Sequence, residues 1–141
     1  EVLHDYIATG LSIKAHPISF LRDHLDRKRL VTADSLRDPS HTPHGRSVGV
    51  AGVVLCRQRP GTASGILFMT LEDETGVANL IIRPKVYEVY RKAARHSVCI
   101  AAWGRVERAS GVTHLIAHRI IELSRLIERV ESPMQTARNF R

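Results

Sequence analysis

Two short segments at the centre of the chain, residues 66–72 and 77–82, are rich in apolar residues and fit β-strands, in which successive side chains point to opposite faces of the sheet. In the first segment both faces carry large apolar residues, which is unusual for a strand with one solvated side. The more continuous apolar set in the first segment consists of Leu67, Met69 and Leu71. We expect this set to fill a core, which leaves Phe68 and Thr70 on the opposite, outer face.

Three further segments have the composition of strands: residues 48–57, 97–107 and 112–123. Gly49 and Gly52 lie where a strongly bent first strand would need a bulge or a kink. Residues 58–65 and 109–111 contain the glycines and polar residues of hairpin loops. The strands are therefore expected to follow one another through short connections.

A helix interrupts this series of strands after Pro84, which lacks an N–H group and suits the first turn of a helix. Its predicted apolar face consists of Val86, Val89, Tyr90, Ala93 and Ala94. One helix between the third and fourth of five strands is the layout of an OB-fold barrel. We therefore predict a mainly β fold, a five-stranded Greek-key OB-fold barrel with a helix between strands 3 and 4, preceded by short α-helices.

Helical patterns precede the predicted barrel. Residues 2–9 fit a short helix, and Pro17 suits the first turn of a second helix that runs from Ile18 to about Arg29. Thr32 is placed to cap a third helix that ends near residue 37. The predicted organisation is a helical lead-in (1–37), a linker (38–46), the OB-fold domain (47–123), and an exit helix with a mobile tail (124–141). The start at a glutamate rather than a methionine suggests a fragment of a longer chain.

The chain carries a formal net charge of +7 and a sequence pI near 10.1, which favours a polyanionic partner. Residues 46–123 hold eleven Lys and Arg against six Asp and Glu, so most of the excess lies in the predicted barrel. No stretch of eighteen apolar residues is present, and no membrane partner is expected. Cys56 and Cys99 lie in apolar runs and are expected to be buried free thiols in a reducing cytoplasm.

The sequence contains no glycine-rich phosphate loop, no Gly-x-Ser-x-Gly motif and no Cys–His pair with an obvious partner. His41 and His44 have no third ligand nearby, so metal binding is not expected there. Residues 72–74 are acidic, but consecutive strand residues point to opposite faces and do not converge on a metal. Asp73 is better interpreted as a turn residue that binds backbone N–H groups ahead of Gly76. No catalytic residue, metal site or cofactor is expected in this chain.

Nucleic-acid binding suits the residues better. OB barrels bind single strands across their second and third strands and the adjoining loops, with cations along the backbone path and aromatic rings on which bases stack. Phe68 is the predicted stacking residue, although the alternation of side chains along the strand, taken alone, would also allow Phe68 to lie in the core. Trp103 is either a second stacking platform or a packing residue at the barrel edge. The predicted nucleic-acid-binding residues are Arg57, Arg59, Phe68, Thr70, Asn79, Arg83, Lys85, Trp103, Arg105 and Arg108.

Several strings in the chain also match a known family. They include Thr9-Gly10-Leu11-Ser12-Ile13-Lys14-Ala15-His16-Pro17, Arg57-Gln58-Arg59-Pro60-Gly61-Thr62-Ala63, Thr70-Leu71-Glu72-Asp73-Glu74-Thr75-Gly76 and the ending Arg138-Asn139-Phe140-Arg141. Together they resemble the C-terminal region of bacterial error-prone C-family DNA polymerases, the damage-inducible paralogues of the replicative polymerase alpha subunit. The resemblance covers nearly the whole chain. It departs from the family in the Pro- and His-rich segment 38–45, where a plainer connection is expected.

This resemblance implies a cytoplasmic enzyme of translesion synthesis, in which an OB domain handles single-stranded DNA template. It also implies upstream polymerase domains that hold the active-site Mg, and a sliding clamp reached through a Y-family-like accessory protein. The metal-binding aspartates of that family lie upstream and have no counterpart here. Residues 66–73 are also similar to the second strand of the anticodon-binding OB domains of class II aminoacyl-tRNA synthetases, in which the aromatic matching Phe68 stacks on a base.

The sequence leaves two other functions open. One is a protein-interaction OB domain that docks polymerase or mutasome partners through Trp103 and the basic helix after Pro84. The other is an RNA-binding OB module of the synthetase type. Single-stranded DNA binding as part of an error-prone polymerase is the function that the residues favour.

Overall fold

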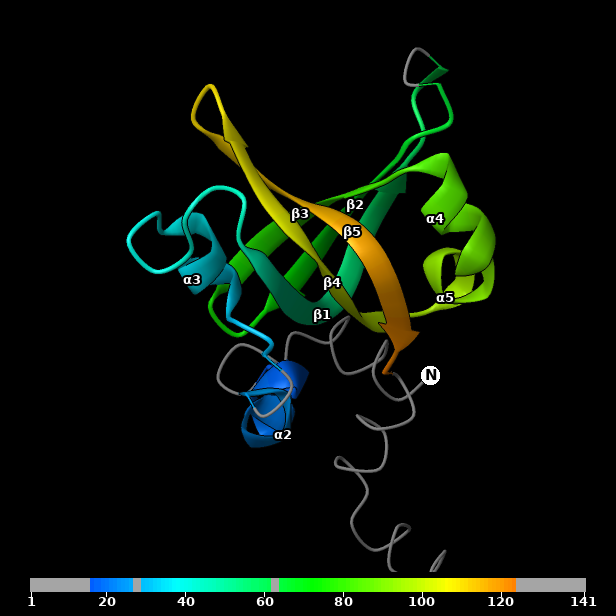
Figure 1. Ribbon diagram of the computed structural model, residues 1–141. Helices are drawn as coiled ribbons and strands as arrows, with labels where there is room; N and C mark the ends of the chain where they lie inside the picture. Colours follow the sequence, from blue (N-terminus) through cyan, green and yellow to red (C-terminus); the bar gives the residue numbers. More distant parts are fainter. Residues whose placement is uncertain (1–15, 27–28, 62–63, 124–141) are drawn as a thin grey trace, which may run out of the picture.

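Five strands curl into one closed barrel, in which they are hydrogen-bonded in the order β1-β2-β3-β5-β4 (Figure 1). The computed structural model describes residues 16–26, 29–61 and 64–123. The strands are β1 (Ser47–Gln58), β2 (Leu67–Asp73), β3 (Gly76–Ile82), β4 (Cys99–Ala109) and β5 (Val112–Glu122). Strands β3 and β5 pair in parallel, and the other pairs are antiparallel. The predicted OB-fold class is confirmed.

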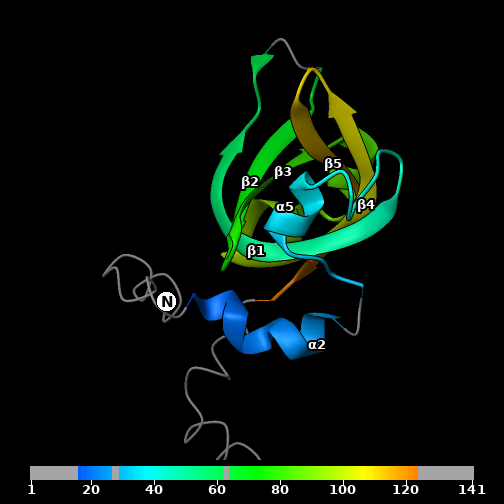
Figure 2. The same ribbon diagram turned by 90° about the vertical axis from the view of Figure 1, so that its left-hand side faces the viewer.

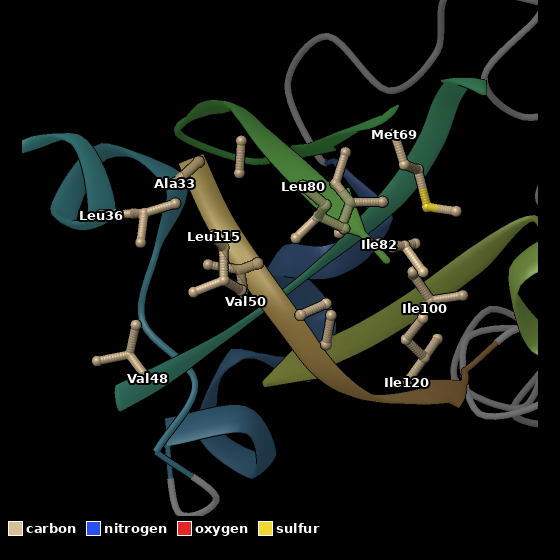
Figure 3. Packing of buried hydrophobic residues seen from close by; sticks show 14 of the residues in the cluster. Ala33, Leu36, Val48, Val50, Met69, Leu80, Ile82, Ile100, Leu115 and Ile120 are labelled. Carbon is tan, nitrogen blue, oxygen red and sulfur yellow. The ribbon is translucent and has the colours of Figure 1, made fainter. Parts of the chain in front are cut away.

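The barrel interior is filled by alternate residues of each strand (Figure 3). Leu67, Met69 and Leu71 are each 5% exposed or less, whereas the residues between them are half-buried on the outer face. The other strands contribute Val50, Leu80, Ile82, Ile100 and Leu115, among others. The predicted core face of β2 is therefore confirmed, because only one parity of this strand can face a closed interior.

Strand β1 contains its bulge at Leu55, not at the glycines where the sequence predicts one. Its pairing with β2 shifts between Val54 and Cys56, which leaves Leu55 as the extra residue. Gly49 and Gly52 instead allow neighbouring residues to pack closely against the β1 backbone. A Cβ atom on Gly49 would lie 2.6 Å from the Trp103 ring, and one on Gly52 would lie 2.7 Å from the Glu72 carbonyl oxygen. Glycine is thus required by crowding on both sides of β1.

Within the described residues, three short helical segments precede the barrel: η2 (Pro17–Leu21), α2 (Arg22–Asp26) and α3 (Ala33–Arg37). The predicted second helix is shorter than expected, because it begins as a 3-10 turn and ends at Asp26. Arg29 has a φ of 61°, a left-handed conformation that does not continue a helix. Thr32 caps α3 as predicted, with its hydroxyl accepting from the Ser35 N–H at 3.0 Å. The predicted helices at 2–9 and 124–130 lie outside the described residues.

Helices η2 and α2 pack on the outside of the barrel, against β1 and β4 (Figure 2). This second apolar cluster, here called the outer cluster, consists of Ile18, Leu21, Leu25, Leu30, Ala51, Val53, Cys99 and Ala101. Leu21 and Leu25 are 0% and 2% exposed. Strands β1 and β4 are therefore apolar on both faces because each face is covered, one by the barrel interior and one by helices.

The β2–β3 turn anchors α3 through Asp73, which is 4% exposed. Its Oδ1 accepts hydrogen bonds from the backbone N–H groups of Thr75 at 2.8 Å and Gly76 at 3.1 Å, so the predicted turn role is confirmed. Its Oδ2 accepts from the Ala33 N–H at 2.7 Å, at the start of α3. The same carboxylate thus shapes the turn and attaches a helix to it.

Arg22 adds an ion pair between α2 and this turn. Its Nε lies 2.8 Å from Glu74 Oε2 and its Nη2 lies 2.9 Å from Glu74 Oε1, a two-pronged geometry. Burial by itself raises the pKa of Glu74, but the hydrogen bonds and charge of Arg22 outweigh it and hold that pKa below its usual value. The acidic turn is a docking point for the helices.

The helix after β3 is broken into α4 (Pro84–Val89) and α5 (Arg91–His96), with Pro84 in the first turn as predicted. Ala94 is buried and Val86, Tyr90 and Ala93 pack partly against the core. Val89 is 73% exposed, so its predicted place on the apolar face is wrong. The helix is interrupted at Tyr90, whose φ is −113°, so residues 86–94 do not form the single continuous helical face that the sequence predicts.

The two cysteines differ in their surroundings. Cys99 is buried in the outer cluster, where burial raises the pKa of its thiol. Cys56 is exposed on β1, so the prediction of a buried thiol is wrong there. The shift of pairing at the bulge turns Cys56 toward the outer face, opposite Thr70. Among the described residues, no helix is long and apolar enough to cross a membrane.

Candidate nucleic-acid interface

The outer face of β2 and β3 carries the predicted stacking and hydrogen-bonding residues side by side. Phe68 is half-buried and lies opposite Ile81, and Thr70 lies opposite the exposed Asn79. The pairing register of β2 with β3 fixes this arrangement. Because Leu67, Met69 and Leu71 occupy the core face of β2, the residues between them and their partners on β3 must face outward. The structure therefore brings Phe68, Thr70 and Asn79 together on one surface.

A short chain of polar side chains crosses this surface. The Cys56 thiol lies 3.6 Å from the Thr70 hydroxyl, which lies 3.3 Å from Asn79 Oδ1. With Oδ1 accepting, the amide N–H donors of Asn79 have no recorded hydrogen-bond partner within the part of the chain that the structure describes. An exposed amide held in this way can donate to a base edge or a sugar oxygen.

Strand pairing extends this surface into a row around the barrel. Gln58 on β1 lies opposite Phe68, Ile81 pairs with Ile116 on β5, and Ile116 pairs with Arg105 on β4. The row thus has half-buried apolar side chains at its centre and a cation at one end. Sequence reasoning missed Ile81 and Ile116 as surface residues, because the parallel β3–β5 pairing joins segments that are far apart in the chain.

Two hairpin connections project from the barrel at the same end, as both views show (Figures 1 and 2). They are the β1–β2 loop, described at residues 59–61 and 64–66, and the tight β4–β5 turn at Ser110 and Gly111, whose φ angles are 54° and 77°. In the β1–β2 loop, the Arg59 guanidinium lies over the ring of Tyr87 on α4, 4.2 Å from its centroid. Tyr87 was not predicted, since nothing in the sequence indicates this contact.

Arg57 is separated from the other predicted site residues. It lies near the end of β1, paired with the inward-facing Met69. Its Nε donates to the Ala94 carbonyl at 2.6 Å, and its Nη2 donates to the Ser97 carbonyl. Burial lowers the pKa of this guanidinium. Arg57 thus satisfies carbonyl groups at the end of α5.

Arg108 is also engaged within the fold. Its Nη2 donates to the Leu36 carbonyl at the end of α3, and its backbone N–H donates to His44 Nδ1 at 3.0 Å. By contrast, Arg59, Arg83, Lys85 and Arg105 are exposed. Arg83 precedes α4 and Lys85 lies in its first turn, beside the end of the β1–β2 loop, where Gly65 approaches Pro84.

Trp103 packs at the edge of the outer cluster rather than on the β2–β3 surface. It lies opposite Gly49 on β1 and Arg119 on β5, and the Arg119 guanidinium is 4.9 Å from its ring centroid. Of the two roles left open by the sequence, this position favours packing. Within the described residues, no group of three or more His, Cys, Asp or Glu side chains is placed to hold a metal ion.

Residues 48–123 match the family model of the OB-fold nucleic acid binding domain. The chain belongs to this family. The match spans the described strands of the OB-fold domain almost from end to end, and it includes β2, β3 and both hairpin connections. Helices η2, α2 and α3, which pack on the domain, lie outside the matched residues.

Almost the whole chain is similar to part of several much longer proteins. The error-prone DNA polymerase of Bradyrhizobium diazoefficiens is 47% identical over 88% of the chain, and error-prone DNA polymerase 1 of Rhizobium meliloti is 42% identical over 90%. The chain spans 11% of the length of each of these relatives. The resemblance to error-prone DNA polymerases is confirmed.

Solved structures share the OB fold at low sequence identity. Asparaginyl-tRNA synthetase from Pyrococcus horikoshii is 21% identical, with a TM-score of 0.52 over 73% of this chain and 26% of the synthetase chain. A chain of the S. pombe Stn1-ten1 complex is 17% identical, with a TM-score of 0.50 over 67% of this chain and 73% of its own length. These similarities show the fold alone.

Proposed function

We propose that this OB-fold domain binds single-stranded DNA template as part of an error-prone translesion DNA polymerase. The observation that carries the proposal is the outward position of Phe68 on β2, beside the Thr70–Asn79 pair. Such a surface, with exposed cations on the adjoining connections, is the arrangement by which OB folds stack bases and follow a phosphate backbone.

Each part of the surface has a separate task in this function. A base stacks on Phe68, which contributes roughly 1–3 kcal/mol and tolerates any sequence because every base has a π-face. The Asn79 amide donates to a base edge or sugar. Arg59 and Arg105, at the two ends of the surface, attract phosphates, so binding weakens as salt rises.

The setting of the domain is proposed from its relatives. Their name, error-prone DNA polymerase, supports a place in a DNA-synthesising enzyme. A role in DNA damage repair and replication in the cytoplasm is part of the proposal. Upstream polymerase domains would supply the Mg-dependent chemistry, and a sliding clamp would be reached through a Y-family-like accessory protein. The domain itself would hold template near that active site.

Titration of a fluorescently labelled oligothymidylate with the full chain tests the proposal. Phe68→Ala is expected to weaken binding by about 1–3 kcal/mol, roughly 5- to 150-fold, through loss of the stacked base. Phe68→Tyr keeps the ring and is the matched control, with affinity expected close to that of the parent chain. Equal loss in both variants, or none in Phe68→Ala, would contradict the stacking role.

Competing ligands separate the other functions. Equal affinity for duplex and single-stranded DNA would indicate charge attraction without a stacking site. A preference for RNA of the same sequence would indicate a synthetase-like RNA module. Failure to bind any nucleic acid at low salt would leave a protein-interaction domain, although the packing of Trp103 against Gly49 and Arg119 weakens one of the two features on which that alternative depends.

A further inference from the structure

We infer that α4 and α5 extend the nucleic-acid path beyond the barrel, with the α5 cations binding the phosphate backbone of a longer single strand. The inference rests on the proposed function and adds a second contact region to it. The basic helical surface is defined here by Arg91, Lys92 and Arg95, all exposed on α5.

Charge is concentrated on these two helices. Residues 83–96 contain five cations, namely Arg83, Lys85, Arg91, Lys92 and Arg95, against the single carboxylate of Glu88. The only recorded ion pair of these residues within the described chain joins Arg91 Nη2 and Glu88 Oε2 at 3.9 Å, with both side chains more than half exposed. Such a surface pair contributes little, so the positive charge is largely uncompensated.

The contact between Arg59 and Tyr87 joins this surface to the β1–β2 loop. It holds a loop cation directly against α4, and Gly65 of the same loop approaches Pro84 at the start of α4. Register places Leu67 at the end of the loop opposite Ile82 at the end of β3. A strand that leaves the barrel face past Arg59 therefore meets α4 next, and α5 after it.

The side chains on α4 and α5 favour a polyanion over a protein partner. Val89 is the one large apolar side chain recorded as exposed on these two helices. Protein interfaces are built around apolar and aromatic cores, and a surface of exposed cations with one exposed valine does not supply such a core. Flexible cations on a helix suit a backbone that is recognised without regard to sequence.

Two labelled oligothymidylates test the inference with the full chain: one of about 5 nucleotides, enough for the barrel face, and one of about 16. The test variant is Lys92→Gln/Arg95→Gln. The control, Arg29→Gln/Arg37→Gln, removes the same charge from exposed residues near α2 and α3, and α3 lies across the barrel from α5 (Figure 1). Thermal melting checks that both variants fold.

The parent chain is expected to bind the longer strand more tightly, and the test variant is expected to lose that gain while it binds the shorter strand normally. Two lost phosphate contacts should make the slope of log K against log salt shallower by about 1.4 for the longer strand. The control should keep both the gain and the slope.

Three results would overturn the inference. The first is a test variant that still binds the longer strand more tightly than the shorter one by the same factor as the parent chain. The second is a control variant that loses this gain in affinity as fully as the test variant does. The third is displacement of the longer strand by polyglutamate as effectively as by unlabelled oligonucleotide, which would indicate that the surface binds an acidic polypeptide. Binding of the short strand that depends on Phe68 would leave the proposed function intact in each case. Failure of the short strand to bind would instead reject the proposed function, and the inference with it.

Discussion

Arg57 and Arg59 stand two positions apart in the sequence, and the structure gives them different surroundings. Arg57 lies on the inward side of β1 and donates to two carbonyl groups near the end of α5. Arg59 is exposed and stacks on Tyr87. The sequence predicts both as nucleic-acid-binding cations, because neither the bulge in β1 nor the position of α5 can be predicted from a local pattern. At the residue scale, charge predicts a function only after the direction of the side chain is known.

This difference gives the first prediction for stability. Arg57→Met leaves the Ala94 and Ser97 carbonyls without their charged donor, and we expect a loss of about 1.5–3 kcal/mol in the free energy of unfolding. Urea denaturation followed by circular dichroism measures it. Arg59→Gln is the control, with unchanged stability and weaker binding to single-stranded DNA. An Arg57→Met protein with unchanged stability and reduced DNA affinity would show that Arg57 contributes to DNA binding rather than to the stability of the fold.

At the scale of elements, sequence periodicity predicts every strand of the barrel to within two residues at each end. It succeeds because a closed barrel forces each strand to alternate between core and surface. It fails at Leu55, where the bulge reverses the parity of β1 and exposes Cys56. A bulge depends on pairing with another strand, so a single segment carries no signal for it. The docking of α2 on the acidic β2–β3 turn was likewise unpredicted.

The Arg22–Glu74 pair gives that docking a pH dependence. The folded-state pKa of Glu74 lies below its ordinary value of 4.5, so the ionised form is favoured by folding. Its contribution is therefore present above pH 4.5 and is lost as the pH falls through the depressed folded-state value. Glu74→Gln should be less stable than the parent chain at neutral pH, and the difference should shrink in acid. Urea midpoints at several pH values measure it.

The control for this experiment is Glu107→Gln, which removes an exposed carboxylate from β4. Its stability relative to the parent chain should depend little on pH over the same range. A difference between the parent and Glu74→Gln that stays constant in acid would show that the Arg22 contact does not depend on the charge of Glu74.

On the scale of the whole molecule, the folded unit is larger than the OB-fold barrel. The sequence predicts the lead-in helices but leaves open whether they pack on the barrel or on upstream domains. The structure shows that Ile18, Leu21 and Leu25 cover the outward faces of β1 and β4. The apolar residues on those outward faces were visible in the sequence, but a strand that is apolar on both sides does not identify the element that covers it.

If the helices and the barrel form one cooperative unit, a cavity in the outer cluster should destabilise both. Leu21 is fully buried there, so Leu21→Ala is expected to cost about 2–5 kcal/mol in the free energy of unfolding. Trp103 is the only tryptophan of the chain and packs at the edge of this cluster, so its fluorescence reports on the helices, while circular dichroism reports mainly on the strands. The two urea transitions should coincide in the parent chain and in Leu21→Ala, at a lower midpoint in the variant.

Leu71→Ala, inside the barrel, is the matched control, and it should lower the urea midpoint seen by fluorescence and by circular dichroism to the same extent. A fluorescence transition that precedes the circular dichroism transition in Leu21→Ala would mean that the helices detach first, and that the barrel is a separate folding unit.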